Sequence, residues 1–289
     1  MGAKILRGDL IAGRILSALG ARAAALERKR GYPPALAILR IGDNPASRAY
    51  ARNQIRIYES RGISVRVAEL GSKSTERAAL KVLDRLTGDP RVDGVIVHTP
   101  LPPAVRFDAL IARLPPEKDV EGLTLRNYGM LYYAKTLQEL KSKDVFVPPT
   151  AQAILMLLRA SGTKLAGAAA VVVGRSGIVG RPAAHLLSCA NATVTLCHSK
   201  TANLARYLRQ ADIVVCAAGR PRSIKGSDLK KGCTVIDAGT SYVGAKLRGD
   251  ADAESVRNAA RAIAPVPGGV GPLTTAMLLA NLLNAAERR

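Results

Sequence analysis

The segment that most constrains this chain is residues 171–182, which reads Val-Val-Val-Gly-Arg-Ser-Gly-Ile-Val-Gly-Arg-Pro. The uncharged apolar run at residues 168–173 is typical of a strand buried on both faces. Gly174, Gly177 and Gly180 then allow a tight turn into a helix. Backbone N–H groups at such a helix start bind a pyrophosphate well. The spacing is not the usual Gly-x-Gly-x-x-Gly, so the strand–turn–helix context carries the prediction of a nucleotide site.

The next predicted strand, residues 192–196, indicates which nucleotide binds. In NAD-binding units an Asp or Glu at this strand end usually binds the ribose hydroxyls, and no acid is present here. Basic and hydroxyl side chains are expected to converge there instead, which suits a 2′-phosphate and predicts NADP. The alternative is that they are ordinary solvated loop residues. The side chains in question are Arg175, Ser176, His198, Ser199 and Lys200.

The formal net charge of +21 admits two interpretations. A nucleic-acid surface would need a basic stripe with stacking aromatic residues, whereas here Arg and Lys are scattered and only 3% of residues are aromatic. Steering of polyanionic small molecules, such as a nucleotide or a substrate with several carboxylates, fits better. Much of the charge could equally be solvated surface. We therefore expect no nucleic-acid partner.

Other compositional features point to an ordinary globular protein. No apolar run approaches the ~20 residues of a membrane span, and no apolar signal-peptide region is visible at the N-terminus, so a cytoplasmic protein without a membrane partner is expected. The four cysteines lack Cys-x-x-Cys spacing and are predicted to be small buried residues. None of the three histidines is spaced as a ligand pair, so no metal is expected.

The first half of the chain alternates helices and strands. Strands are predicted at residues 35–41, 63–70 and 94–97, and helices at 5–29, 47–61 and 75–87, the last capped by Ser74. Such alternation implies parallel strands joined by right-handed crossovers.

A second unit is predicted from about residue 148, after the charged linker at residues 141–144. Its strands are expected at residues 168–174, 192–196, 213–217 and 234–238, and a final helix at 272–286 should return to the first unit. The predicted fold is therefore α/β, with two α/β domains around a cleft. Residues 1–145, joined by the C-terminal helix 271–289, would bind folate and carry catalysis, and residues 146–270 would form a Rossmann-type NADP-binding domain with a parallel sheet.

Ligands of open α/β sheets bind beyond the carboxyl ends of the strands, so the loops there are candidate sites. Tyr50 and Gln54 lie four residues apart and would share one helix face. Each candidate also has a structural interpretation: a core tyrosine for Tyr50, a structural histidine for His98, and a solvated acidic turn for Asp119 and Glu121.

Eight stretches, in order, carry a resemblance to a known family. They lie at residues 42–50 (Gly-Asp-Asn-Pro-Ala-Ser-Arg-Ala-Tyr), 93–97, 100–102, 118–120, 174–182, 198–201, 211–215 and 265–272. The chain resembles, over nearly its full length, the bifunctional methylenetetrahydrofolate dehydrogenase/methenyltetrahydrofolate cyclohydrolase family.

The resemblance implies a function in one-carbon metabolism. Methylene-tetrahydrofolate, with a polyglutamate tail in cells, would be oxidised by hydride transfer to NADP⁺, and the methenyl product hydrolysed to formyl-tetrahydrofolate. The enzyme would be a homodimer. Catalysis is assigned to Tyr50, Gln54, His98 and Glu121. Substrate binding is assigned to Ser47, Tyr50, Pro100, Leu101, Asp119, Glu121, Pro267, Gly268 and Gly269. NADP binding is assigned to Gly174, Arg175, Ser176, Ile178, Val179, Gly180, His198, Ser199 and Thr240.

Three positions depart from the family pattern. Gln54 stands where the family has its catalytic lysine, His98 replaces a glutamine, and Glu121 replaces an aspartate. Hydrolysis requires proton transfers that an amide cannot make, whereas hydride transfer chiefly requires geometry. Cyclohydrolase activity is therefore either lost or weakened, or restored by His98 as acid/base with Gln54 orienting it.

Two further readings remain open. One is another NADP-dependent two-domain dehydrogenase, such as a shikimate-type oxidoreductase. The other is a non-catalytic, basic nucleic-acid-binding protein, which would bind DNA in a strongly salt-dependent way.

Overall fold

The computed structural model describes residues 2–244 and 246–288, except for the side chains of five residues. These are Pro45, Ala46, Ser47, Ala49 and Tyr50. The predicted roles of Ser47 and Tyr50 therefore concern side chains that lie outside the described residues. The chain forms two compact units: residues 1–13 with 130–277, and residues 14–129 with 278–289.

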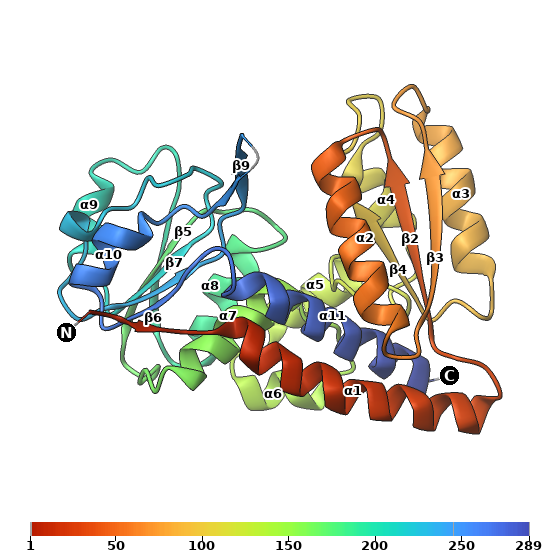
Figure 1. Cartoon of the computed structure of the whole chain (residues 1–289), viewed down its shortest axis with the longest axis horizontal. Helices are drawn as coiled ribbons and strands as arrows, with labels where there is room; N and C mark the ends of the chain where they lie inside the picture. Colours follow the sequence, from red (N-terminus) through yellow and green to blue (C-terminus); the bar gives the residue numbers. More distant parts are fainter. Residues whose placement is uncertain (1, 245, 289) are drawn as a thin grey trace. The chain divides into compact units, whose positions relative to one another are not determined.

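The smaller unit, residues 14–129 with 278–289, contains a parallel three-stranded sheet in the order β3-β2-β4 (Figure 1). Helix α2 lies on one side of the central strand β2, and α3 lies on the other. The elements are β2 (Ala35–Ile41), α2 (Pro45–Glu59), β3 (Ser64–Leu70), α3 (Glu76–Gly88), β4 (Gly94–His98) and α4 (Phe107–Arg113).

The two faces of β2 differ because side chains alternate along a strand. Ala37, Leu39 and Ile41 are buried in an apolar cluster that includes Ala79 and Leu83 of α3. The intervening side chains, among them that of Arg40, point to the opposite face. That face is covered by α2.

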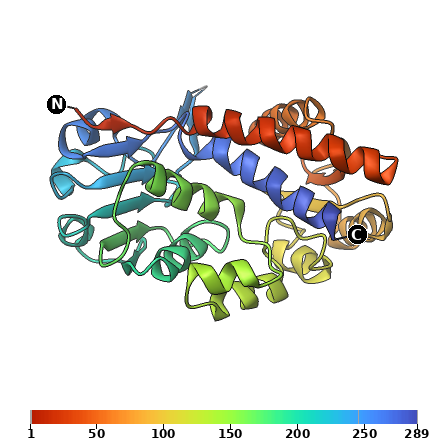
Figure 2. The ribbon, with the colours of Figure 1, turned by 90° about the horizontal axis from the view of Figure 1, so that it is seen from below.

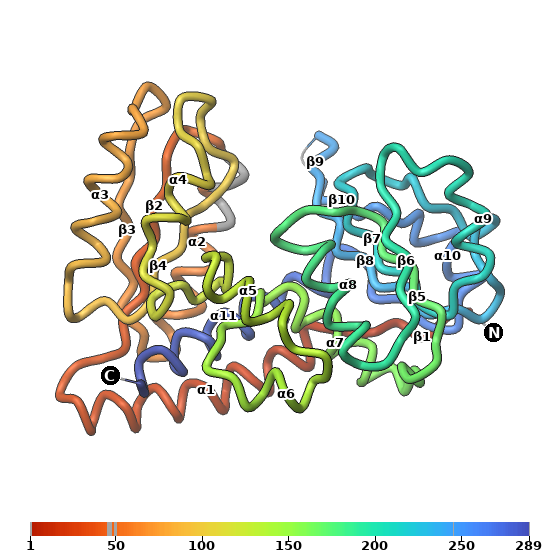
Figure 3. Tube along the Cα trace, turned by 180° about the vertical axis from the view of Figure 1, so that it is seen from behind, coloured from red at the N-terminus to blue at the C-terminus, as the bar shows by residue number. Residues whose placement is uncertain are grey.

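The larger unit is built on a six-stranded sheet in the order β1-β11-β8-β7-β5-β6, parallel throughout. Figure 3 traces the chain through this unit. Its strands are β1 (Lys4–Ile5), β5 (Ala169–Val173), β6 (Thr193–Cys197), β7 (Ile213–Cys216), β8 (Thr234–Asp237) and β11 (Ala262–Ala264). A separate antiparallel hairpin is formed by β9 (Ser241–Val243) and β10 (Lys246–Arg248). The helices are α6 (Leu137–Ser142), α7 (Pro149–Ala160), α8 (Gly180–Cys189), α9 (Leu204–Leu208), the short 3-10 helix η1 (Gly226–Asp228) and α10 (Ala253–Ala259).

Three helices contribute residues to both units: α1 (Gly8–Arg30), α5 (Leu125–Tyr133) and α11 (Val270–Glu287). In the smaller unit the later part of α1 lies beside the end of α11 (Figure 2), where Arg22 forms an ion pair with Glu287 and donates to Asn284 Oδ1 at 2.7 Å. The last residues of the chain thus belong with the three-stranded sheet. The compact units also place residues 130–145 and the first residues of the chain with the six-stranded sheet, not with residues 14–129.

Most predicted elements are confirmed to within two residues, including β2 with its exact bounds, but three details were wrong. The predicted linker at residues 141–144 is partly helical, since α6 extends to Ser142. Lys4 and Ile5 form strand β1 instead of beginning the first helix, since they pair with β11. The cap of α3 is Thr75, not Ser74, because the Thr75 hydroxyl accepts from the Ala78 N–H at 3.3 Å. The four cysteines are buried and free, as predicted. Among the described residues, no helix is long and apolar enough to cross a membrane.

Candidate functional site

Gln54 and His98 are joined by a hydrogen bond at the carboxyl end of the three-stranded sheet. Gln54 lies on α2, is 1% exposed, and its Oε1 is 3.2 Å from Nε2 of His98, the last residue of β4. The Gln54 amide nitrogen donates to the Tyr58 hydroxyl at 3.3 Å, one turn further along α2. Since a carbonyl oxygen only accepts, this arrangement assigns the His98 proton to Nε2.

Burial sets the protonation state of His98. Desolvation, and secondly the positive charge of Arg40, lower the pKa of His98 to about 4. The imidazole is therefore neutral at physiological pH, and Gln54 orients it.

Asp119 is fully buried beside the edge of β4, where it forms a β-bridge with Val95. Its Oδ2 accepts from the Thr124 N–H at 2.7 Å and from the Asn127 amide at 2.8 Å. Its Oδ1 is buried with no hydrogen-bond partner among the described residues. A buried carboxylate with one orphaned oxygen suits a ligand that donates a hydrogen bond.

Glu121 follows two residues later and is half-buried. Desolvation, and then repulsion from Asp119, raise the pKa of Glu121 to about 8, although the Val97 backbone N–H opposes this rise. Near neutral pH the carboxyl is therefore mostly protonated and can donate a hydrogen bond as well as accept one.

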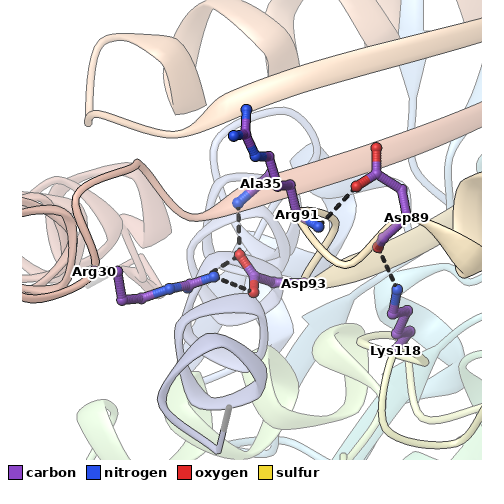
Figure 4. A network of polar contacts seen from close by, with 6 residues as sticks. All are labelled: Arg30, Ala35, Asp89, Arg91, Asp93 and Lys118. Carbon is purple, nitrogen blue, oxygen red and sulfur yellow. Dashed lines mark hydrogen bonds and ion pairs between the residues drawn. The ribbon is translucent and has the colours of Figure 1, made fainter.

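Lys118 anchors the segment that carries these two acids. Its ammonium donates to the backbone carbonyl of Thr87 at 2.5 Å and to that of Asp89 at 2.8 Å, at the end of α3. Figure 4 shows the contact with Asp89. A cation at a helix C-terminus satisfies carbonyls that lack intrahelical partners. Lys118 thus fixes residues 119–121 to the body of this unit.

The remaining predicted substrate residues lie in two loops. Pro100 is exposed just after β4, and Leu101 packs against the apolar cluster on the α3 face. Pro267, Gly268 and Gly269 belong to the other unit, where the Gly268 carbonyl accepts from the Asp9 N–H at 3.1 Å.

The predicted nucleotide turn forms a tight cradle between β5 and α8. A Cβ on Gly174 would lie 2.0 Å from the Ala217 carbonyl oxygen, and a Cβ on Gly180 would lie 2.0 Å from the Gly174 carbonyl oxygen. The Ser176 hydroxyl accepts from the N–H groups of Val179 and Gly180 at 3.2 and 3.3 Å. Only glycine fits at both contact points, so the backbone can approach a pyrophosphate closely.

The turn after β6 lies next to this cradle, because β5 pairs with β6 and the Gly174 N–H donates to the Cys197 carbonyl at 2.9 Å. His198 Nδ1 accepts from the Lys200 N–H at 3.1 Å, and this bond orients the ring. Arg175 and Ser199 are exposed on the two turns, and Thr240 is exposed after β8. Neither turn carries an acidic side chain. The donors present fit a dinucleotide with a 2′-phosphate.

Two buried acids, Asp237 at the end of β8 and Asp250, were missed by the sequence analysis. Asp250 Oδ2 accepts from the N–H groups of Ala218 and Gly219 at 2.6 and 3.0 Å and so holds the turn after β7. Asp237 accepts from the N–H groups of Gly239, Asp250 and Ala251, and burial raises its pKa to about 6. Their local sequence offers no signal, since both act on backbone groups brought together by the sheet.

Arg40 was missed as well. It is a buried charge beside His98, and the one available signal was a basic residue inside the apolar run of residues 35–41.

Two sequence models match this chain. The one described as tetrahydrofolate dehydrogenase/cyclohydrolase, catalytic domain, matches residues 6–121. The one described as tetrahydrofolate dehydrogenase/cyclohydrolase, NAD(P)-binding domain, matches residues 148–289. Among curated relatives, the bifunctional protein FolD of Bordetella petrii is 42% identical over 99% of this chain and 95% of its own length. That of Halothermothrix orenii is 43% identical over 98% of each chain.

Solved structures give the same result. The bifunctional FolD methylenetetrahydrofolate dehydrogenase/cyclohydrolase from Campylobacter jejuni superposes with a TM-score of 0.92 at 36% identity, covering 99% of both chains. The Trypanosoma brucei enzyme, solved with NADP cofactor and an inhibitor, gives 0.93 at 35% identity, covering 100% of this chain and 98% of its own. Shikimate 5-dehydrogenase from Thermus thermophilus, at 16% identity and a TM-score of 0.51, shares only the fold.

Proposed function

Because this chain belongs to the tetrahydrofolate dehydrogenase/cyclohydrolase family, we propose that it oxidises methylene-tetrahydrofolate to methenyl-tetrahydrofolate with NADP⁺. The observation that carries the proposal is the match of both family domains along one chain, together with the glycine cradle between β5 and α8. Neither alternative, a shikimate-type dehydrogenase or a nucleic-acid-binding protein, has this support.

The nucleotide is assigned to the cradle and its neighbouring turn. Gly174 and Gly180 let the backbone approach the pyrophosphate. We keep as further cofactor-binding candidates Ile178 and Val179, which lie between these two glycines, and Thr240, which follows β8. Arg175, His198 and Ser199 would bind the 2′-phosphate. NADP⁺, when bound, supplies the acceptor for the hydride.

The folate is assigned to the carboxyl end of the three-stranded sheet. Asp119 and Glu121 would bind the donor groups of the pterin, since one presents an orphaned carboxylate oxygen and the other a carboxyl that both donates and accepts. Gln54 and His98 would lie beside the reacting carbon. We retain Ser47, Tyr50, Pro100, Leu101 and the loop 267–269 as further substrate-binding candidates.

Oxidation of the methylene bridge gives a cationic methenyl product, so the charge of the surrounding groups matters. His98 is neutral at physiological pH and adds no positive charge beside that product. Hydride transfer requires a fixed geometry, which the Gln54–His98 bond helps to provide.

Hydrolysis of the methenyl product is proposed to be weak in this chain. Water attack and ring opening need a group that accepts and returns a proton near neutral pH. Gln54 cannot do so, and His98, with its pKa near 4, is a poor acid or base there. The geometry therefore favours the weakened-cyclohydrolase explanation over rewiring through His98.

Two assays on one purified sample test the proposal. Methylene-tetrahydrofolate is supplied with NADP⁺ or NAD⁺, and the decay of added methenyl-tetrahydrofolate is followed against buffer alone. We expect reduction that is faster with NADP⁺ and decay close to the buffer rate. No reduction with either nucleotide would refute the dehydrogenase, and rapid decay would refute the weak hydrolysis. A homodimer, a cytoplasmic location and a polyglutamylated folate stay predictions.

A further inference from the structure

Arg40 is a buried charge in the middle strand of the three-stranded sheet. The other residues of β2 are Ala, Leu and Ile, and all seven positions are buried. Arg40 itself is 3% exposed. Burying a guanidinium is unfavourable unless it is paired and hydrogen-bonded. Its partners therefore indicate what the charge does.

Arg40 is paired with one acid, from the edge strand. Its Nε and one terminal nitrogen lie 3.0 and 2.9 Å from Oε1 of Glu69 on β3, and its other terminal nitrogen donates to the Gly42 carbonyl at 3.3 Å. The Glu69 side chain is 56% exposed. Because water screens the carboxylate more than the guanidinium, the charge of Arg40 is only partly neutralised within the protein.

The strand register places Arg40 between Glu69 and His98. Arg40 pairs with Glu69 across β2 and β3, and with His98 across β2 and β4. Residues paired in a parallel sheet project from the same face. The three side chains therefore form a row, and Gln54 from α2 holds the far end of that row at His98.

The charged and titratable groups around His98 come from three directions. Arg40 faces it from β2, and Tyr58 reaches it from α2 through Gln54. Asp119 and Glu121 lie in the segment beside the edge of β4. Of these groups, only Arg40 contributes a charge that alters the ionisation of His98.

We propose that Arg40 is a positioning residue for the reaction, which adds to burial in holding His98 as the neutral imidazole whose Nε2 proton is directed to Gln54. Glu69 fixes the guanidinium in place from the solvent side. This role of Arg40 rests on the proposed function, because the proposed function assigns His98 to the folate site. The consequence for catalysis is that His98 stays uncharged to a lower pH than burial alone would allow.

The test is a titration of His98 by nuclear magnetic resonance, with the signal assigned through a His98→Asn variant. Arg40→Met removes the charge and keeps much of the stem. Arg40→Gln also removes the charge but retains donors for Glu69 and Gly42, and provides the same test should the Met variant not fold. Arg40→Lys keeps the charge. Arg56→Gln, an exposed site on α2, is the matched control for loss of one positive charge.

We expect the midpoint of His98 to rise by about one pH unit in both neutral variants and to change little in the Lys and Arg56 variants. In the neutral variants, the dehydrogenase kcat should fall at low pH as His98 becomes protonated, with KM for NADP⁺ unchanged. An unchanged midpoint in a folded neutral variant would overturn the proposal. Because the titration needs no substrate, it remains informative even if the chain shows no dehydrogenase activity, so the two proposals fail separately.

Discussion

The Oε1 atom of Gln54 lies 3.2 Å from Nε2 of His98, and this bond joins helix α2 to the end of strand β4. The Gln54 amide has no titratable proton, and its partner is a histidine whose pKa lies near 4. The two groups can hold a geometry, but neither can exchange protons readily at neutral pH. This pairing suits hydride transfer and disfavours hydrolysis.

Restoring a lysine at position 54 should therefore restore hydrolysis. Gln54→Lys is expected to raise the cyclohydrolase rate at least tenfold, since a positioned acid/base is worth about 10²–10⁴ in rate. Dehydrogenase kcat should change less than about threefold, because hydride transfer depends on geometry. The measurement is the decay of methenyl-tetrahydrofolate. Asn53→Lys, at the exposed neighbouring position, is the control and should leave that decay unchanged.

Glu121 should make stability depend on pH. Its folded-state pKa of about 8 lies above the ordinary 4.5, so the folded chain keeps a proton that the unfolded chain has released. Stability therefore falls as pH rises from about 4.5 to about 8, and is level outside that range. Glu121→Gln removes this dependence, so the free energy of unfolding of the variant should gain about 4 kcal/mol relative to the parent between pH 5 and pH 8.5.

Urea unfolding at three pH values measures the effect of Glu121. The control is Glu117→Gln, which removes a carboxyl at an exposed position four residues earlier. Other groups that titrate in this range, such as Asp237, cancel in the comparison of variant with parent. A difference for Glu121→Gln that does not change with pH would show that this carboxyl is ionised in the folded chain.

Local patterns predicted the elements well, but not the contacts between them. The apolar run of β2 and the glycines at positions 174 and 180 constrain their own backbone, so their structure follows from the sequence. The role of Arg40 depends on Glu69 and on His98, which are 29 and 58 residues further along the chain and are brought together by strand register. A two-residue strand such as β1 is likewise too short to show periodicity.

The preference for NADP⁺ should depend on Arg175. Arg175→Ala removes a charged donor from the turn before α8, where charge-assisted hydrogen bonds are worth about 1.5–3 kcal/mol. The KM for NADP⁺ is expected to rise about tenfold or more, while that for NAD⁺ changes less than about twofold. Arg206→Ala, an exposed arginine on α9, should alter neither constant. Equal weakening of both nucleotides would place Arg175 at the pyrophosphate instead.

The nucleotide cradle should not tolerate a methyl group at position 174. Gly174 has φ +126°, and an added Cβ would lie 2.0 Å from the Ala217 carbonyl oxygen. Gly174→Ala is therefore expected to destabilise the chain by about 2–4 kcal/mol and to abolish NADP binding, measured by calorimetry. Gly13→Ala, at a helical position with no atom within 4 Å of the added Cβ, should instead stabilise by about 0.5–1 kcal/mol.

The ion pair between Arg30 and Asp93 should be a main support of the three-stranded sheet. Asp93 is fully buried, accepts from Arg30 at 2.8 and 3.2 Å, and also accepts from the Ala35 N–H at 2.8 Å, so it joins the end of α1 to the starts of β2 and β4 (Figure 4). Asp93→Asn keeps the shape but leaves the mostly buried guanidinium without its counter-charge, which costs about 3–5 kcal/mol. Asp84→Asn breaks the exposed pair with Arg113 and should cost less than about 1 kcal/mol. Similar losses in the two variants, measured by urea unfolding, would mean that burial does not strengthen the Arg30–Asp93 pair.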